Sequence, residues 1–309
     1  MLVALAGGIG AARFLEGLVK VVPPADLFII GNTGDDTEMH RLHISPDLDT
    51  LVYTLAGMAN RTHGWGLEGD TFECLGSLGR LGAETWFQLG DRDFATHIFR
   101  TGRLHSGQKL SAITAEVCSR FGLKCKITPM SDDRVRTIVR TPEGKLPFQT
   151  YFVQRRASDR VLGVRFEGAA KSLPAPGILR AIREASGIIF CPSNPIISVG
   201  PILAVPGIRS AIERRKCPAV AISPIVGGRA LKGPAAEMMA GMGIEVSAKG
   251  VAEIYRGLVD VLVLDREDRH LASGIEQLGT RAVVTNTIMR GMPEKKALAR
   301  AVVRALGER

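Results

Sequence analysis

Apolar and polar positions follow two periods along this chain, and the two periods alternate from segment to segment. Leu2–Ala6 and Leu27–Gly31 are short apolar runs that end at a glycine turn and at Asn-Thr-Gly. Such runs predict strands that are buried on both faces. Residues 11–21 carry apolar side chains at helical spacing, so they predict a helix between the two strands.

The same alternation returns later in the chain. Residues 111–121 predict a helix with Ser111 as its N-cap and Gly122 as its stop. Further helices are predicted at 176–185, 207–214, 248–257 and 294–306, and further strands at 124–128, 187–191, 219–223 and 260–264. This succession predicts an α/β fold with a doubly wound, mainly parallel, Rossmann-like sheet.

One region departs from the alternation and is rich in strands. Residues 135–140, 148–153 and 161–166 predict strands with no helix between them, and a Thr-Pro-Glu-Gly turn separates the first two. We interpret residues 134–168 as a small β-rich insertion. The insertion divides the Rossmann-like core into a first part, residues 1–133, and a second part, residues 169–309.

The composition of the chain mainly argues against certain classes of protein and of site. No segment has the roughly 18 uninterrupted apolar residues of a membrane helix, and the N-terminal residues resemble a strand and not a signal peptide. The 5 cysteines are widely spaced and odd in number, which favours buried free thiols in a reducing compartment over disulfides or a zinc site. We therefore expect a cytoplasmic protein that contacts no membrane.

The net charge of +9 raises the question of a nucleic-acid partner. The basic residues are scattered, however, and aromatic residues make up only 5% of the chain, too few for a base-stacking surface. A basic protein is equally suited to substrates that carry several phosphates. We expect small phosphorylated ligands and no nucleic acid.

A glycine turn, Gly7-Gly8-Ile9-Gly10, joins the first predicted strand to the first predicted helix. Residues without a Cβ allow the backbone to approach a phosphate, and the helix N-terminus offers free N–H groups. Gly7, Gly8 and Gly10 are therefore candidate phosphate-binding residues, and Arg13 is placed to add a guanidinium. A tight turn without a ligand is the alternative. A P-loop is excluded because Gly-Lys-Ser/Thr is absent, and a dehydrogenase pattern fits poorly because Arg13 stands where a third glycine belongs.

Carboxylates gather after the second predicted strand. Asp35 and Asp36 follow Asn-Thr-Gly, and Asp47 and Asp49 belong to the segment Ser-Pro-Asp-Leu-Asp. In a doubly wound sheet this places them at the carboxyl edge beside the glycine turn. Several carboxylates facing a diphosphate are suited to holding Mg²⁺, and we take Asp35 and Asp49 as its candidate ligands. The alternative is that these residues form turns and cap helices.

Two further polar segments stand out. Residues 89–97 open a helix with alternating charges, and we expect His97 to make hydrogen bonds there, since no cluster of metal ligands accompanies it in the sequence. Ser193 and Asn194 follow a fully apolar predicted strand and lie between two prolines that fix the loop. They are candidate nucleotide-binding residues, although a rigid loop without a ligand explains them equally well.

These motifs, in this order, resemble the 2-phospho-L-lactate transferases of coenzyme F-420 biosynthesis and their bacterial phosphoenolpyruvyl-using relatives. The resemblance covers nearly the whole chain. It rests on AGGIGAARFL at residues 6–15, SPDLDT at 45–50 with Tyr53, GWG at 64–66, LGDRDFATH at 89–97, PMSDD at 129–133, PSNP at 192–195, VPGIR at 205–209 and GVA at 250–252.

The resemblance implies a particular reaction. The donor is a guanosine diphosphate derivative that carries lactate or enolpyruvate on its second phosphate, and the acceptor is the ribityl hydroxyl of the deazaflavin Fo. GMP leaves, Mg²⁺ is required, and the enzyme is a homodimer. In this family an aspartate matching Asp49 contacts the deazaflavin, and so does a lysine whose position is Gln88 here. A glutamine can form a hydrogen bond but supplies no charge.

The main rival is a related non-catalytic family of UDP-sugar-binding regulatory proteins with the same glycine turn. That family has Asp-Asp-Gly-Gly-Ser after the second strand, whereas Asp35-Asp36 is followed here by Thr-Glu-Met. The Ser-Pro-Asp-Leu-Asp segment also fits the transferases. The sequence therefore favours a transferase in which Asp49 lies near the attacking hydroxyl and acts either as a base or through the metal.

Overall fold

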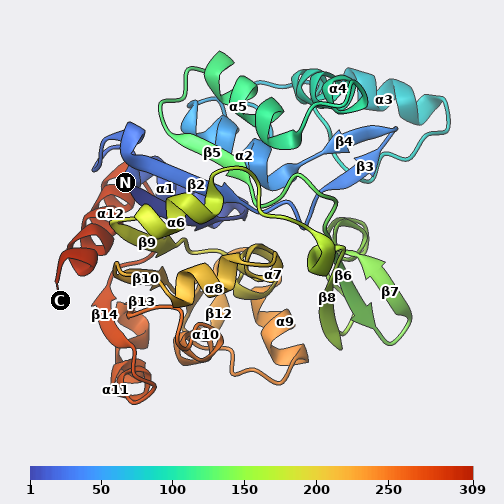
Figure 1. The fold of residues 1–309 in the computed structure, drawn as a ribbon. Coiled ribbons are helices and arrows are strands. Elements are labelled where there is room, and N and C mark those ends of the chain that lie inside the picture. The colour runs from blue at the N-terminus through green and yellow to red at the C-terminus, as the bar shows by residue number, and fades with distance from the viewer. Residues whose placement is uncertain (309) are drawn as a thin grey trace.

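The computed structural model describes residues 1–308 and contains a central sheet of 7 parallel strands. Figure 1 shows this sheet running through the middle of the molecule. Its strands, in spatial order, are β14 (Arg281–Thr285), β13 (Val261–Asp265), β10 (Ala219–Ile222), β9 (Gly187–Phe190), β1 (Leu2–Ala6), β2 (Leu27–Gly31) and β5 (Lys126–Pro129). The predicted doubly wound parallel sheet is confirmed.

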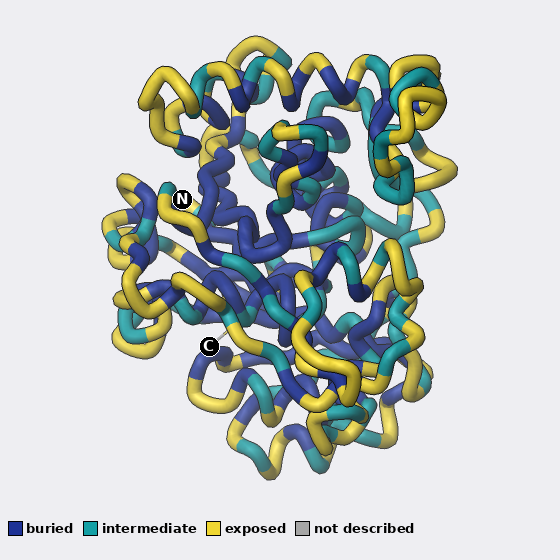
Figure 2. The backbone as a smooth tube through the Cα atoms, turned by 90° about the vertical axis from the view of Figure 1, so that its right-hand side faces the viewer, coloured by how far each residue is buried: buried dark blue, intermediate teal, exposed yellow. Residues whose placement is uncertain are grey.

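The apolar runs form strands because helices cover both faces of the sheet. Val3 and Leu5 of β1 belong to one hydrophobic cluster, whereas Ala4 and Ala6 belong to the other. Both clusters are fully buried at these positions, and the tube in Figure 2 is dark blue through the centre of the molecule. Alternation of side chains across a strand thus gives one core to each face.

Each face has its own set of helices. The face with Ala4 packs against α1 (Gly8–Leu18), α2 (Pro46–Leu55), α5 (Leu110–Arg120) and α12 (Met292–Gly307). The face with Val3 packs against α6 (Ile178–Glu184), α7 (Gly200–Ala204), α8 (Ile208–Glu213), α9 (Ala235–Gly241), α10 (Ala248–Ile254) and α11 (Ala272–Glu276).

A smaller cluster lies beyond the edge of the sheet. There α3 (Glu73–Arg80) and α4 (Asp91–His105) pack against the hairpin of β3 (Thr37–Met39) and β4 (Leu42–Ile44). Met39, Ile44, Leu75, Leu89 and Phe94 form its buried centre. The remaining short elements are η1 (Pro24–Asp26), η3 (Ala169–Lys171), η4 (Pro195–Val199), η5 (Arg266–Leu271), β11 (Ile225–Val226) and β12 (Arg229–Ala230).

The β-rich insertion has three strands, but the second of them along the chain is not where the sequence predicted it. β6 (Arg136–Thr141) pairs antiparallel with β7 (Gly144–Pro147) and with β8 (Gly163–Glu167). The strand predicted at 148–153 is wrong, because η2 (Thr150–Gln154) is a short π-helix. Phe148 and Tyr151 are buried there against the core, so the helical backbone allows both rings to pack on it.

Other differences are local. Lys109, and not Ser111, is the N-cap of α5, and Ser111 instead donates its hydroxyl to Asp132. Strand β14 was not predicted, because its residues are only half-buried and its pattern is weak. The 5 cysteines are free, as expected, but Cys74 is exposed. Among residues 1–308 no helix is long and apolar enough to span a bilayer.

The order of the strands fixes where a site can form. β1 lies between β2 and β9, so the chain leaves β1 toward one side of the sheet first and toward the other side later. Parallel strands bring their carboxyl ends to one edge, and a crevice opens where the strand order reverses. The glycine turn after β1 and the Pro-Ser-Asn-Pro loop after β9 flank that crevice.

Candidate active site

A pocket of about 710 Å³ follows the carboxyl edge of the sheet. Its walls include the turns after β1, β2, β9, β10 and β14 and parts of α2 and α4, and residues 65–66, 87–88, 148–153 and 231–235 complete them. All the residues that the sequence singled out as a site line this one pocket: Gly7, Gly8, Gly10, Arg13, Asp35, Asp49, Gln88, Ser193 and Asn194. The fold therefore brings together segments that lie up to 187 positions apart, from residue 7 to residue 194.

The structure explains why glycine is needed in this turn and how the turn is held in place. Gly8 has a φ of +73°, which disfavours any residue with a Cβ. A side chain at Gly10 would overlap the carbonyl oxygen of Pro192. The N–H of Gly7 donates to Ser193 Oγ at 3.3 Å, which fixes the loop after β9 against the turn. Since α1 begins at Gly8, the N–H groups of Ile9 and Gly10 have no carbonyl one turn earlier and remain available to a ligand.

Asp47 sits directly beside this turn. Its carboxylate accepts the N–H of Gly8 at 2.8 Å and the Asn32 amide Nδ2 at 2.9 Å. Burial raises the pKa of Asp47 to about 6, although both donors counter that rise. At neutral pH the ionised carboxylate thus lies at the mouth of the phosphate cradle without any cation as a partner among residues 1–308.

Asp35 is a second buried acid, and it forms no ion pair within residues 1–308. Only 5% of its surface is exposed, and Oδ1 has no hydrogen-bond partner within the described chain. Burial, and after it the negative charge of Asp47, hold the pKa of Asp35 well above its usual range. Buried, unpaired carboxylates are costly, so the pair Asp35 and Asp47 is suited to a divalent cation with oxygen ligands.

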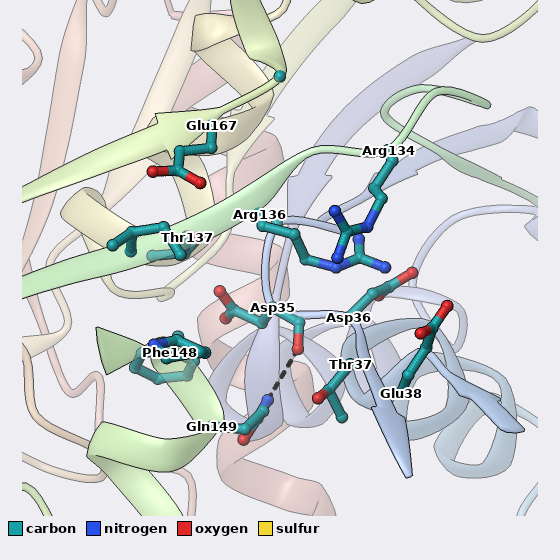
Figure 3. A pocket seen from close by; sticks show the side chains of 14 residues that line it. Asp35, Asp36, Thr37, Glu38, Arg134, Arg136, Thr137, Phe148, Gln149 and Glu167 are labelled. Carbon is teal, nitrogen blue, oxygen red and sulfur yellow. Dashed lines mark hydrogen bonds between the residues drawn. The ribbon is translucent and has the colours of Figure 1, made fainter. Parts of the chain in front are cut away.

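Asp35 also separates the main pocket from a smaller one of about 340 Å³. Figure 3 shows this smaller pocket between Asp35 and Asp36 on one side and Arg134 and Arg136 of the insertion on the other. Gln149 donates its Nε2 to the backbone oxygen of Asp35 at 2.9 Å and so connects the insertion to the loop after β2.

Asp49 differs from these acids because a cation already holds it. Arg100 of α4 donates from Nη1 to Oδ2 at 3.1 Å and from Nη2 to Oδ1. Burial raises the pKa of Asp49, and the Arg100 guanidinium counters that rise. The bidentate contact fixes the carboxylate and its orientation toward the pocket. Of the two predicted metal ligands, Asp35 thus has an oxygen without a partner in residues 1–308, whereas both oxygens of Asp49 are held by Arg100.

His97 lies in the same buried network. Its Nδ1 is 3.8 Å from Asp49 Oδ2 and its Nε2 is 3.3 Å from Asp93 Oδ1, and Tyr53 donates its hydroxyl to Asp93 at 2.7 Å. The interpretation that His97 lacks a cluster of ligands is wrong, because Asp49, Asp93 and His97 have ligand atoms within 4.8 Å of one another. Arg100 Nη1, at 3.3 Å from His97 Nδ1, already supplies a positive charge to this group.

Sequence reasoning missed Arg100 and treated Asp93 only as part of a charged helix start. The signal was helical spacing: Asp93, His97 and Arg100 are 4 and 3 residues apart on α4, and Asp49 and Tyr53 are 4 apart on α2. Residues at these separations share one face of a helix. Two helices with polar stripes on their buried faces therefore meet at this network, which only the packing of α2 near α4 reveals.

The two amides among the predicted site residues are arranged differently. Asn194 uses its Oδ1 to accept the N–H groups of Ile196 and Ile197, so it caps η4 while lining the pocket. Gln88 is exposed, and its Nε2 donates to the Thr85 oxygen at 3.0 Å. Five aromatic side chains also line the pocket: Tyr53, Trp65, Phe87, Phe148 and Phe152. Such a wall suits planar ring systems.

Comparison with known proteins gives a consistent result. The family described as 2-phospho-L-lactate transferase CofD matches residues 2–300. A phosphoenolpyruvate transferase of Streptomyces griseus is 45% identical over 305 residues, which cover 97% of this chain and 96% of that protein. A 2-phospho-L-lactate transferase of Methanosarcina mazei is 39% identical over 304 residues, covering 98% of this chain and 100% of that protein.

Among solved structures, a crystal structure of a UPF0052 family member from Bacillus halodurans is similar to this chain. The two superpose with a TM-score of 0.68, at 16% sequence identity, and the match covers 98% of each chain. At that level of identity the likeness concerns the fold alone.

Proposed function

The chain belongs to the 2-phospho-L-lactate transferase CofD family, and we propose that it transfers a phospholactyl or phosphoenolpyruvyl group from a GDP-activated donor to the deazaflavin Fo. The ribityl hydroxyl oxygen of Fo forms a bond to the phosphorus that carries the three-carbon acid. The bond from that phosphorus to the bridging oxygen breaks, and GMP leaves with the bonding electrons. The product is coenzyme F-420-0 or its dehydro form.

One observation carries this proposal: the glycine turn and Asp49 line a single pocket of about 710 Å³, and Arg100 holds the carboxylate of Asp49. Ligand pockets of roughly 300–1,000 Å³ are typical of sites for small molecules. Phosphoryl transfer depends chiefly on alignment and on charge neutralisation, so a rigid cradle and a fixed carboxylate in one cavity are the parts that it requires.

In this proposal Asp49 is the catalytic residue and contacts the attacking hydroxyl. Arg100 holds both of its carboxylate oxygens, and Asp49 is only 6% exposed, so the carboxylate cannot swing away from the acceptor. Asp49 then accepts a hydrogen bond from the hydroxyl and takes its proton as the new bond forms. Gln88 and the aromatic side chains that line the pocket contact the deazaflavin ring system.

The nucleotide half of the donor belongs at the turns after β1 and β9. The free N–H groups of Ile9 and Gly10 face the phosphates, Arg13 adds a guanidinium, and Ser193 and Asn194 form the neighbouring wall. Ser193 accepts the N–H of Gly7 at 3.3 Å and thereby holds the two loops at a fixed separation.

Mg²⁺ is the cofactor that we propose. It neutralises the charge on the transferred group and on the leaving phosphate when it is bound. Asp35 fits it best, because its Oδ1 is buried and unpartnered and the charge of Asp47 acts on it. Asp49, the other ligand expected from the sequence, is available only through the lone pairs that Arg100 leaves free.

The test is incubation with Fo, Mg²⁺ and either lactyl or enolpyruvyl diphosphoguanosine, followed by mass spectrometry. We expect one donor to give a product of the mass of F-420-0 or dehydro-F-420-0, together with GMP. No product with either donor would count against the transfer. A larger thermal shift with UDP-N-acetylglucosamine than with GDP would favour the rival, a UDP-sugar-binding regulatory protein.

Two properties stay predictions. The homodimer that the family resemblance implies is testable by light scattering, and the cytoplasmic location by fractionation of cells. Neither bears on the chemistry of the pocket.

A further inference from the structure

Three cationic side chains line the main pocket without an acidic partner. Arg13, Lys232 and Arg290 form no ion pair with any acid of residues 1–308. Other long cations of this protein do find carboxylates, as Lys295 does with Glu16. Unpaired cations that converge on a cavity point to an anionic ligand.

Acidic and basic side chains line different sides of the pocket, because the order of the strands separates them. Its acids, Asp35, Asp47, Asp49 and Asp93, come from the loop after β2 and from α2 and α4. Lys232 comes from the segment between β12 and α9, which follows β10, and Arg290 follows β14. Since β10 and β14 lie on the opposite side of β1 from β2, these two cations face the acids across the glycine turn.

Lys232 reaches across the mouth of the pocket toward the turn. Its Nζ lies 3.4 Å from the position that a Cβ on Gly64 would occupy, and the Ile9 side chain lies 3.1 Å from the same position. The loop that contains Gly64, the glycine turn and the Lys232 segment therefore meet at one place. Partial burial, and after it the charge of Arg13, lower the pKa of Lys232.

The segment that carries Lys232 is held firmly at its base. The N–H of Gly227 donates to both carboxylate oxygens of Asp268 at 3.1 Å, and β11 and β12 pair antiparallel just before Lys232. Pro234 and Ala235 are buried just after it. The lysine is thus presented by an anchored hairpin, although its own side chain is exposed.

We infer that Lys232 and Arg13 together clamp the diphosphate of the donor against the glycine turn. The lysine supplies a point charge from above, Arg13 a planar fork from α1, and the turn its free N–H groups from below. The inference rests on the proposed function only for the identity of the nucleotide, because any diphosphate satisfies this chemistry.

The test measures the binding of inorganic pyrophosphate and of GDP by calorimetry. Lys232→Gln removes the charge, Lys232→Arg keeps it, and Lys124→Gln is the matched control. Lys124 is exposed and precedes β5, so it lies at the amino edge of the sheet, away from the pocket. Thermal melts of the four proteins establish that each is folded.

We expect Lys232→Gln to weaken both ligands by about 10- to 100-fold, as the loss of a charge-assisted hydrogen bond does. Lys232→Arg should bind within about threefold of the unaltered protein, and Lys124→Gln should not differ from it. In steady-state kinetics the Lys232→Gln defect should raise KM for the donor and leave kcat nearly unchanged, since the contact is made before and during transfer.

Pyrophosphate binding by Lys232→Gln equal to that of the unaltered protein would overturn the clamp, and so would absence of pyrophosphate binding to the unaltered protein. If pyrophosphate binds and depends on Lys232, but neither guanosine donor is turned over, the clamp stands and the proposed transfer fails. The two ideas therefore fail in different experiments.

Discussion

Arg100 of α4 donates hydrogen bonds to both carboxylate oxygens of Asp49 on α2, and both side chains are buried. A buried acid in the proposed active site is thus held by a partner 51 positions further along the chain. The contact joins two helices and at the same time fixes a reactive group, so its removal should affect both stability and turnover.

Arg100→Met should destabilise the protein by about 3–5 kcal/mol, because it leaves the carboxylate of Asp49 buried without its cation. Arg103→Met is the control on the same helix, since Arg103 forms only a partly exposed pair with Glu116 at 3.4 Å. It should cost less than about 1 kcal/mol. Chemical denaturation measures the free energy of unfolding of both variants. Equal losses would show that the pair of Arg100 and Asp49 stabilises the protein no more than the partly exposed pair does.

Asp49→Asn should lower kcat by at least about 100-fold, because the amide keeps the shape of the side chain but cannot take a proton from the acceptor. GDP binding should stay within a few fold of the unaltered protein, since Asp49 lies on the acceptor side. A variant that binds GDP and retains full turnover would remove Asp49 from its assigned role.

Asp47 makes stability depend on pH in a definite direction. Burial raises its pKa to about 6 in the folded protein, whereas the unfolded chain has the ordinary value of about 4. Between these values the folded state holds more protons, so the free energy of unfolding falls as the pH rises through roughly 4 to 6. The destabilisation caused by burying the ionised carboxylate of Asp47 is fully present above about pH 6 and absent below about pH 4.

Asp47→Asn removes this titration while its Oδ1 still accepts the N–H of Gly8. We therefore expect the stability of Asp47→Asn, relative to the unaltered protein, to increase by roughly 1–3 kcal/mol between pH 4 and pH 7. Asp26→Asn, at an exposed residue of η1, should show no such trend. Urea titrations across this pH range provide the measurement, and a flat difference for Asp47→Asn would refute the assignment.

Asp35→Asn should abolish most of the increase in GDP affinity that Mg²⁺ produces. Its buried, unpartnered Oδ1 is the oxygen best suited to the cation, and an amide oxygen binds Mg²⁺ less strongly than a carboxylate does. Calorimetry with GDP in the presence of Mg²⁺ or of EDTA gives the readout. If Mg²⁺ enhances binding equally in Asp35→Asn and in the unaltered protein, the ion is held elsewhere.

Gln88→Ala should raise KM for Fo by about 2- to 10-fold and leave KM for the donor unchanged, since a neutral hydrogen bond contributes about 0.5–1.5 kcal/mol. Gln88→Lys, which restores the family's residue, should bind Fo at least as tightly. Gln108→Ala, at an exposed residue after α4, is the control. A rise in KM for the donor would contradict the assignment of Gln88 to the acceptor site.

The sequence by itself determined the strands at the centre of the sheet and the segments of the site. Leu2–Ala6 and Leu27–Gly31 match β1 and β2 to the residue, because strands buried on both faces need uninterrupted apolar runs. The predicted site residues all line one pocket, because the carboxyl ends of parallel strands meet at one edge. The motifs also identified the family.

Only the tertiary structure decided which charges are paired. Arg100 and Asp49 lie on different helices, and no local pattern says that α4 turns its polar stripe toward α2. Lys232 precedes an ordinary short helix in the sequence, yet the fold brings it above the glycine turn. Side-chain pairing depends on distances between elements that are remote in sequence, and those distances are set by packing on the two faces of the sheet. The strand predicted at 148–153 failed for the same reason, since the burial of Phe148 and Tyr151 against the core favoured a π-helix over its local β pattern.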